Sequence, residues 1–227
     1  MIKLYGVAAS NYFNSVKHAL LVKAIDFTEV ETYTGNKDES YLDKSPMGKI
    51  PCIETESGCL SEATVILDYL EDVYPTPPLY PADAFGRAKV RQIMKMAELY
   101  IELQARRHIP EVVAGTPRLD EAFKEVPGMM KRGLRALDRL CGKGRFLFGE
   151  QLTYADIHTR YCLKIGKRIA YKIYDWDMLA EFEHLNRWYE AFAEDPVAKK
   201  VDAESAAAMA AFIAHVQQQR SAAGASA

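Results

Sequence analysis

The residues of this chain that could form a redox or metal centre are not spaced to form one. The four cysteines stand at Cys52, Cys59, Cys141 and Cys162. No two of them have the Cys-x-x-Cys spacing of a dithiol redox site, and none has zinc-site spacing with a histidine. The five histidines (His18, His108, His158, His184 and His215) show no pairing pattern either. We therefore predict no metal site and interpret the cysteines as small buried hydrophobic residues.

A proline stands at the start of a short strand pattern in the stretch Ser-Pro-Met-Gly-Lys-Ile-Pro-Cys, residues 45–52. The residues after Pro51 alternate like a strand over 52–55. A proline inside a paired strand removes a backbone donor, so it is confined to strand starts, sheet edges or bends. The stretch alone leaves three readings open for Pro51: a strand-initiating residue, an edge residue or a cis bend.

A second chemical feature is the start of a predicted helix at Glu62 and Ala63. The free N–H groups and the dipole of a helix N-terminus bind carboxylates. Glu62 could bind a ligand cation beside them, or it could simply be an acid placed favourably in a first helical turn.

The elements that must position these residues follow a pattern that changes after residue 75. The first part predicts strands at 2–7, 27–33, 52–55 and 59–60, with helices at 15–24 and 62–74 and one short helix at most at 41–44. Four prolines between residues 75 and 81 predict a linker. The rest predicts helices at 85–109, 119–140, 153–172, 178–194, where Pro196 ends the helix, and 203–219. We expect an α/β domain over residues 1–77, an all-α domain over 85–220 and a mobile tail over 221–227.

Composition excludes several classes of function. The chain has 227 residues, a formal net charge of −2 and no basic stripe, so nucleic acid is not expected as a partner. No apolar run reaches the length of about 18 residues that a membrane span needs. The N-terminus lacks the long apolar segment of a signal peptide. We expect a cytoplasmic protein that does not bind membranes.

Three motifs resemble those of the cytosolic glutathione transferase family. They are Pro46-x-Gly48-Lys49-Ile50-Pro51, Leu60-Ser61-Glu62-Ala63 and the segment 152–157, Leu-Thr-Tyr-Ala-Asp-Ile. The resemblance covers nearly the whole chain. It implies an α/β thioredoxin-like N-terminal domain followed by an all-α helical-bundle C-terminal domain, with a cis peptide bond before Pro51.

The resemblance also implies where glutathione would bind, as co-substrate. The N–H and C=O of Ile50, beside Pro51, would pair with the cysteinyl unit as in strand addition. Glu62 and the helix start at Ala63 would bind the γ-glutamyl end, although the family usually has serine in place of Ala63. The glycine carboxylate would fall to Lys49, or to Lys37 with Asn36.

The catalytic group implied by the family is a hydroxyl or thiol after the first strand. In this chain that position is Ser10, and the resemblance is to the serine-type classes. Asn11 is an alternative donor, and Tyr5 fits poorly because it lies within the predicted strand. The electrophile would bind between the domains, and its candidate residues are Tyr12, Leu103, Arg107, Tyr161 and Phe212.

The activity we expect is conjugation of the glutathione thiolate to small hydrophobic electrophiles, as in detoxification. The alternatives are glutathione-dependent reduction of peroxides or disulfides, and an interaction module without catalysis.

The helices predicted at 62–74 and 85–109 carry more apolar surface than one core face needs. A helix that is apolar on two faces must bury both, so we expect a symmetric homodimer formed through these helices.

Overall fold

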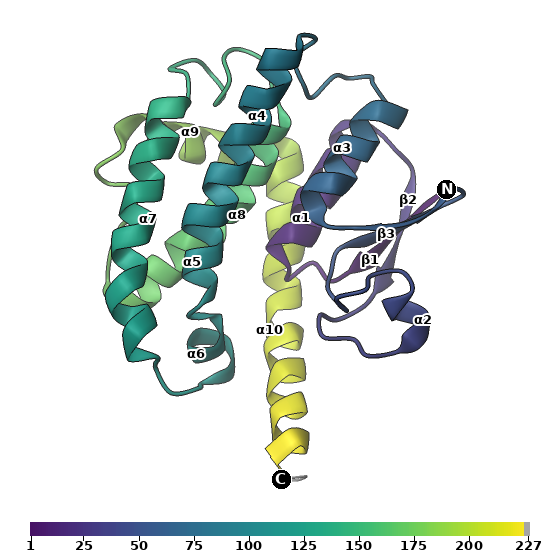
Figure 1. The fold of residues 1–227 in the computed structure, drawn as a ribbon, viewed down its shortest axis with the longest axis vertical. Coiled ribbons are helices and arrows are strands. Elements are labelled where there is room, and N and C mark those ends of the chain that lie inside the picture. Colours follow the sequence, from purple (N-terminus) through teal and green to yellow (C-terminus); the bar gives the residue numbers. More distant parts are fainter. Residues whose placement is uncertain (225–227) are drawn as a thin grey trace.

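Figure 1 shows the computed structural model, in which a small sheet-containing domain packs beside a larger domain of helices. The structure describes residues 1–224, and it describes side chains through residue 218. The first domain contains β1 (Ile2–Gly6), α1 (Asn11–Val22), β2 (Phe27–Glu31), α2 (Glu39–Leu42), β3 (Cys52–Thr55), β4 (Gly58–Ser61) and α3 (Ala63–Val73). The second contains α4 (Ala84–Ala97), the π-helical turn η1 (Glu98–Glu102), α5 (Leu103–Arg106), α6 (Ile109–Ala114), α7 (Asp120–Leu140), α8 (Tyr154–Tyr174), α9 (Glu183–Ala193) and α10 (Pro196–Gly224).

The first domain is built on one mixed sheet with the strand order β2-β1-β3-β4. β1 pairs in parallel with β2 and antiparallel with β3, and β3 returns as β4 in a hairpin. Leu4 and Ile53 face each other across β1 and β3 and join a buried core with Leu20 of α1 and Ile66 of α3. This is the thioredoxin-like arrangement expected from the sequence. Because β1 is central, the loop that follows it opens at the edge where the two domains meet.

The first helix begins earlier than the sequence pattern predicts. It starts at Asn11, not at residue 15, because Ser10 acts as its N-cap: the backbone of Ser10 is extended and its Oγ accepts a hydrogen bond of 3.4 Å from the N–H of Phe13. Residues 11–14, which the sequence pattern leaves between the strand predicted at 2–7 and the helix predicted at 15–24, are therefore helical. As a result, the Ser10 hydroxyl lies at the positive end of a helix.

The proline-rich linker is held against the first domain by a buried ion pair. The Nζ of Lys23 lies 2.8 Å from Glu71 and also donates to the carbonyl oxygens of Tyr74 and Pro77. Glu71 in turn accepts from the N–H of Leu79. The connection between the domains therefore has a fixed path, which helps to fix the cavity that lies between them.

Several predicted helix limits in the second domain are wrong. The single helix expected over 85–109 is divided by η1 and ends at Arg106, and Pro110 then lies in the first turn of the separate helix α6. α9 begins at Glu183 instead of residue 178. Pro196 does not merely end a helix but begins α10, because the missing N–H of a proline costs nothing in a first turn. The Oδ1 of Asp195 accepts from the next two free N–H groups.

The C-terminal helix is longer than the pattern predicts. It runs from Pro196 to Gly224, whereas the sequence predicts a start at residue 203. The tail expected over 221–227 falls on the end of this helix and on residues 225–227, which lie outside the described range. Among the described residues, no helix combines the length and apolar character that crossing a membrane requires.

The two domains meet along α1. On the side of α8, Ser15 bonds to His158 at 3.1 Å and His18 bonds to Tyr161 at 2.9 Å. On the other side, the buried ammonium of Lys17 joins Glu29 of β2 to Glu204 of α10, each at 2.5 Å. α1 is thus fixed between β2, α8 and α10, as its position in Figure 1 shows.

Candidate active site

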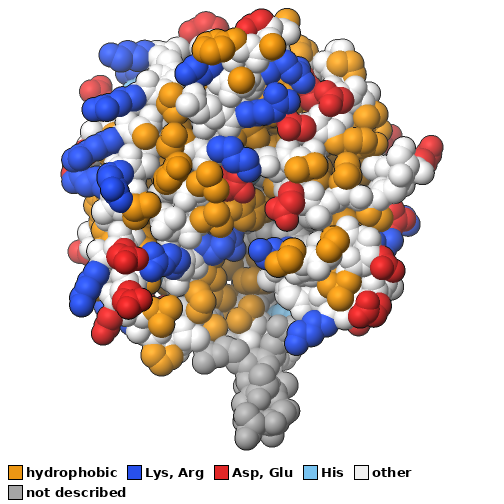
Figure 2. Space-filling model, viewed as in Figure 1, with side chains coloured by type: hydrophobic (Ala, Val, Ile, Leu, Met, Phe, Trp, Pro, Cys, Tyr) orange, Lys and Arg blue, Asp and Glu red, His pale blue; other side chains and the backbone are white. Residues whose placement is uncertain are grey.

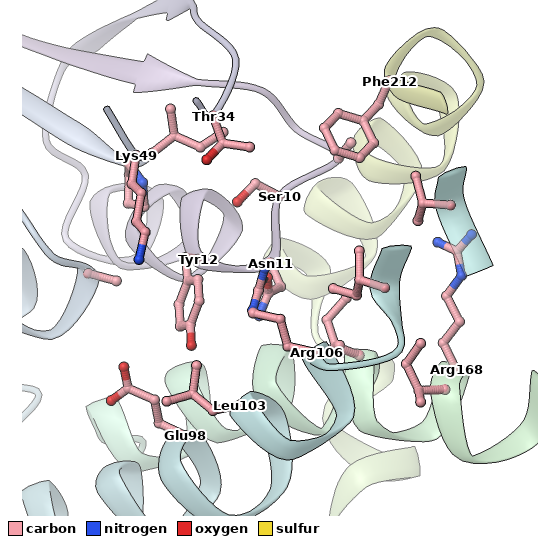
Figure 3. A pocket seen from close by; sticks show the side chains of 18 of the residues that line it. Ser10, Asn11, Tyr12, Thr34, Lys49, Glu98, Leu103, Arg106, Arg168 and Phe212 are labelled. Carbon is pink, nitrogen blue, oxygen red and sulfur yellow. Dashed lines mark hydrogen bonds between the residues drawn. The ribbon is translucent and has the colours of Figure 1, made fainter. Parts of the chain in front are cut away.

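A cavity of about 390 Å³ opens between the two domains at the start of α1. One wall, which we call the peptide side, comes from the first domain: Ala9, Ser10, Thr34, Lys49, Ile50, Pro51, Ser61, Glu62 and Ala63. The opposite wall, the helical side, consists of Glu98, Leu103, Arg106, Ile109, Val112, Val113, Ile165, Arg168, Ile169, Met209 and Phe212. Asn11 and Tyr12 lie at the junction of the two walls (Figure 3).

The peptide side presents an unpaired stretch of backbone. The Ile50–Pro51 bond is cis, which confirms the expectation. Within the described residues, neither the N–H nor the C=O of Ile50 has a hydrogen-bond partner. Gly48, with a φ of +60°, shapes the loop before it, because a Cβ there would lie only 2.3 Å from the carbonyl oxygen of Asn36. An extended peptide could therefore pair with Ile50 as an added strand.

Glu62 has a strained backbone at the start of α3. Its φ is +69°, a conformation that non-glycine residues rarely adopt outside functional sites. Its carboxylate makes no cap bond to the helix, although Glu62 occupies the N-cap position. Ala63 and the first turn of α3 follow directly and also line the cavity. A carboxylate and a set of free N–H groups therefore lie side by side, which suits a ligand end that carries both an ammonium and a carboxylate.

Only one of the two lysines proposed to bind the glycine carboxylate of glutathione lies in the cavity wall. Lys49 lines the cavity, whereas Lys37 and Asn36 do not. Asn36 instead supports the loop: its Oδ1 accepts from the N–H of Asp38 and its N–H donates to the carbonyl oxygen of Gly48. Lys49 is thus the better placed candidate, and Thr34, which the sequence analysis missed, lines the same wall.

Three side chains are candidates for the thiol-activating group, and among the described residues only Ser10 does not already donate to another side chain. The Ser10 hydroxyl lines the cavity and only accepts its long cap bond from Phe13, so its O–H can still donate. The Asn11 amide is held by two hydrogen bonds, since its Nδ2 donates to Glu102 at 3.1 Å and its Oδ1 accepts from Arg106. Tyr5 donates to Glu54 at 2.6 Å and lies away from the cavity.

A buried polar cluster beneath the cavity was not predicted from the sequence. Glu102 is fully buried and accepts from Asn11, from the phenol of Tyr12 at 2.7 Å and from Arg106, whose Nη2 also donates to the Oδ1 of Asn11 at 2.9 Å. Burial and the charge of Glu102 raise the pKa of Tyr12, so its phenol stays protonated. Glu102 ends the π-helical turn η1, and such turns often occur at functional sites. The cluster ties the start of α1 to the second domain.

Three of the five electrophile-site candidates line the cavity, and two do not. Tyr12, Leu103 and Phe212 are in its wall. Tyr161 is almost fully buried, with its phenol bonded to His18, so it cannot reach a ligand. Arg107 follows the end of α5 and pairs with Glu125 of α7 at 3.0 Å, outside the cavity. Both of these predictions are corrected by the helix limits and packing described above.

Much of the helical side could not be found by motif. Its additional residues come from α6, α8 and α10, which converge on the cavity from distant parts of the chain. Most are apolar, but Arg168 of α8 also lines it. Periodicity marks each of these helices as amphipathic, yet it does not say which residue of a long helix ends up facing a cavity.

The prediction that the cysteines are buried is confirmed for three of the four. Cys52, Cys141 and Cys162 are buried, whereas Cys59 is half-buried. Burial raises the pKa of the Cys52 thiol to about 12.

Comparison with known proteins identifies the family of the chain. Two protein-family models match the chain: glutathione S-transferase, N-terminal domain, over residues 4–78, and glutathione S-transferase, C-terminal domain, over residues 94–196. A glutathione S-transferase of Pseudomonas putida is 38% identical over 94% of this chain and 96% of its own length. The maleylacetoacetate isomerase of Pseudomonas aeruginosa is 23% identical over 90% of this chain and 100% of its own.

Solved structures give the same result for the fold. A glutathione S-transferase from Rhodospirillum rubrum has a TM-score of 0.73 at 25% identity, covering 88% of this chain and 91% of its own. The Tau class glutathione S-transferase of mango has a TM-score of 0.77 at 24% identity, covering 95% of this chain and 98% of its own. With both domain models matched in order and a bacterial relative matched over almost its full length, the chain belongs to the glutathione S-transferase family.

Proposed function

We propose that this transferase conjugates the thiolate of glutathione to small hydrophobic electrophiles, with Ser10 as the group that stabilises the thiolate. The observation that supports this most directly is the pairing of two features in one wall: an O–H that is free to donate at Ser10 and an unpaired peptide unit at Ile50. A cysteinyl residue paired with Ile50 would place its sulfur on the same wall as Ser10. Glu62 and Lys49 would then bind the two ends of the tripeptide.

The energetics of this arrangement are sufficient without a general base. A free thiol has a pKa near 8.5, and lowering it by about two units needs roughly 2.7 kcal/mol of preference for the thiolate. A hydrogen bond to a charged group contributes about 1.5–3 kcal/mol. The N-terminus of α1 adds about 0.3–1 kcal/mol. The hydroxyl of Ser10 and the helix that it caps can therefore hold the sulfur ionised near neutral pH.

The helical side would hold the electrophile. Most of its side chains are apolar, and they come from α5, α6, α8 and α10, so a hydrophobic molecule entering the cavity is removed from water beside the sulfur. We propose detoxification as the physiological context and the cytoplasm as the location; both rest on the family resemblance.

The test compares activities on the same purified chain. Wild-type protein is assayed with glutathione and chlorodinitrobenzene, then with glutathione and a hydroperoxide, and glutathione affinity is measured by calorimetry. Conjugation that exceeds reduction supports the proposal. Reduction without conjugation favours the peroxidase or disulfide reductase alternative, and glutathione binding without either activity favours an interaction module. No glutathione binding at all refutes the proposed site.

We also propose that the chain forms a symmetric dimer through α3 and α4. Val65 and Val73 of α3 and Phe85 of α4 are large apolar side chains that remain exposed, Phe85 by 73%. Figure 2 shows hydrophobic side chains on the face over these helices. We expected Glu71 and Asp72 to supply acidic partners at the rim of this interface. Glu71 is instead buried against Lys23 and is not available, whereas Asp72 is exposed.

Sedimentation equilibrium at micromolar concentration tests the dimer. A mass twice the chain mass of 25.6 kDa supports it, and a single chain mass refutes it. A Phe85→Ser variant should shift the equilibrium toward monomer, because it removes the most exposed apolar side chain of this face.

A further inference from the structure

The charged residues of the helical side differ in how they are neutralised. Glu98 pairs with Lys95 at 2.6 Å, and Arg106 is bound to the buried carboxylate of Glu102. Arg168 also lines the cavity, but no carboxylate among the described residues pairs with it. Its recorded partner is the sulfur of Met209, 3.3 Å from Nη1. A thioether is a weak acceptor, so most of the guanidinium donors of Arg168 are not used by the protein.

The surroundings of Arg168 favour an anion. The helical side on which it lies is lined mainly by apolar side chains of α6, α8 and α10, among them Met209, which contacts Arg168 directly. A charge beside apolar walls is less screened than one in water, so an opposite charge placed there is bound more strongly. The guanidinium also offers paired donors that match the two oxygens of a carboxylate. A strictly neutral ligand bound here would remove water from the Arg168 guanidinium without supplying an opposite charge, so the site disfavours such a ligand.

Glutathione itself does not account for Arg168. Figure 3 shows Arg168 and Lys49 at opposite ends of the cavity in this view, with Ser10 and Asn11 between them. The peptide side already carries Lys49 for one carboxylate and the start of α3 for the other. Arg168 is therefore on the wall that would face the second substrate.

We propose that the preferred electrophile carries an anionic group, a carboxylate or a sulfonate, on an apolar body, and that Arg168 binds this group. The inference rests on the proposed transferase function and specifies its substrate class. The apolar body would lie against the helical side with its reactive carbon toward the sulfur near Ser10. The anion would point away from the sulfur, toward α6 and α10. Arg168 is then a specificity-determining residue that contacts the substrate.

The experiment uses two matched electrophiles. Chlorodinitrobenzoate and chlorodinitrobenzamide share one ring and one leaving group and differ in charge. In each, the thiolate of glutathione attacks the ring carbon, a C–S bond forms, the C–Cl bond breaks and chloride leaves with the electron pair. The thiol proton passes to solvent. The ratio of kcat/KM for the carboxylate to that for the amide is measured for each protein variant, so that differences in intrinsic reactivity cancel between variants.

We expect Arg168→Met to lower this ratio by about tenfold, the low end for a charge-assisted hydrogen bond because Arg168 is partly exposed. Arg168→Lys should retain most of the preference. Lys172→Met is the matched control: it removes one positive charge from the same helix, one turn further on, at an exposed position outside the cavity. It should leave the ratio unchanged. Raising the ionic strength should reduce the wild-type ratio, because salt screens a partly exposed charge pair.

The proposal is overturned if the ratio is equal in wild type and Arg168→Met, or if it falls equally in Lys172→Met. If the ratio is equal and the KM for glutathione rises in Arg168→Met, Arg168 is assigned to glutathione. If wild type turns over neither ring, the transferase proposal has failed for these electrophiles. The affinities of the unreactive dinitrobenzoate and dinitrobenzamide, measured by calorimetry, then decide the role of Arg168 alone: a preference for the anion that Arg168→Met abolishes supports it, and equal affinities refute it.

Discussion

Replacing Ser10 by alanine tests the central step, because Ser10 is the one of the three candidate thiol-activating side chains that does not already donate to another side chain among the described residues. The donated hydrogen bond is worth about 1.5–3 kcal/mol when its acceptor is charged. At 1.36 kcal/mol per pKa unit, its loss raises the pKa of bound glutathione by about one to two units. Below that pKa, the thiolate fraction and the conjugation rate fall by the same factor, about 10- to 100-fold. The side effect on folding should be small, since the cap bond to Phe13 is long, at 3.4 Å.

The assay is the pH dependence of kcat/KM with saturating glutathione, supported by the ultraviolet absorbance of the bound thiolate. The acidic limb of the Ser10→Ala profile should move to higher pH, and its rates should approach those of wild type once both thiols are ionised. Ser10→Thr, which keeps the hydroxyl and the cap, is the control. A uniform drop at all pH values, or an unchanged acidic limb, would refute the assignment of Ser10 to the thiolate.

Three other substitutions test the parts around Ser10. Glu62→Gly should weaken glutathione binding about tenfold or more, measured by calorimetry. It should leave thermal stability unchanged or raised, because glycine tolerates the φ of +69°. A loss of both binding and stability would contradict the interpretation that the strain at Glu62 serves binding. Glu102→Gln should cost about 2–3 kcal/mol of unfolding free energy, because Arg106 then lacks its buried partner, and Glu102→Gln with Arg106→Gln should recover part of this in urea denaturation; full additivity would refute the coupling. Burial lowers the pKa of His158 and His18 to about 4, so the unfolded chain takes up protons first as the pH falls below 6.5. The free energy of unfolding should drop by about 2 kcal/mol per histidine between pH 7 and pH 5, and His158→Gln should make this drop smaller by the contribution of one histidine. An equal drop in wild type and in the variant, measured by urea denaturation at both pH values, would contradict this.

The peptide side could be predicted from sequence because its chemistry is local. Lys49, Ile50 and Pro51 are consecutive, and Glu62 precedes α3 directly after the hairpin, so neighbours in the chain are also neighbours in the wall. Ser10 fits the same logic, since a loop after a central strand of a sheet ends at the same edge.

The helical side could not be predicted, because its composition depends on where helices end and how they pack. Arg107 falls within the single helix predicted over 85–109, but the chain leaves the helix after Arg106, so Arg106 lines the cavity and Arg107 lies outside it. Tyr161 falls within the helix predicted over 153–172, and its side chain packs against α1 instead of facing the cavity. No pattern within α8 separates Tyr161, which is buried, from Arg168, which lines the cavity.

The partners of the charged side chains distinguish residues that build the cavity from residues that would bind a ligand. Glu98 and Arg106 are matched by charges of the protein itself, so they fix its shape and add little net field. Lys49, Glu62 and Arg168 line the same cavity without an opposite charge beside them among the described residues. Lys49 and Glu62 are exposed and Arg168 is partly exposed, so all three keep contact with water in the empty protein and are available to a ligand that brings the complementary charges. A tripeptide with an ammonium and carboxylates satisfies the first two, and the third is left for the molecule with which the tripeptide reacts.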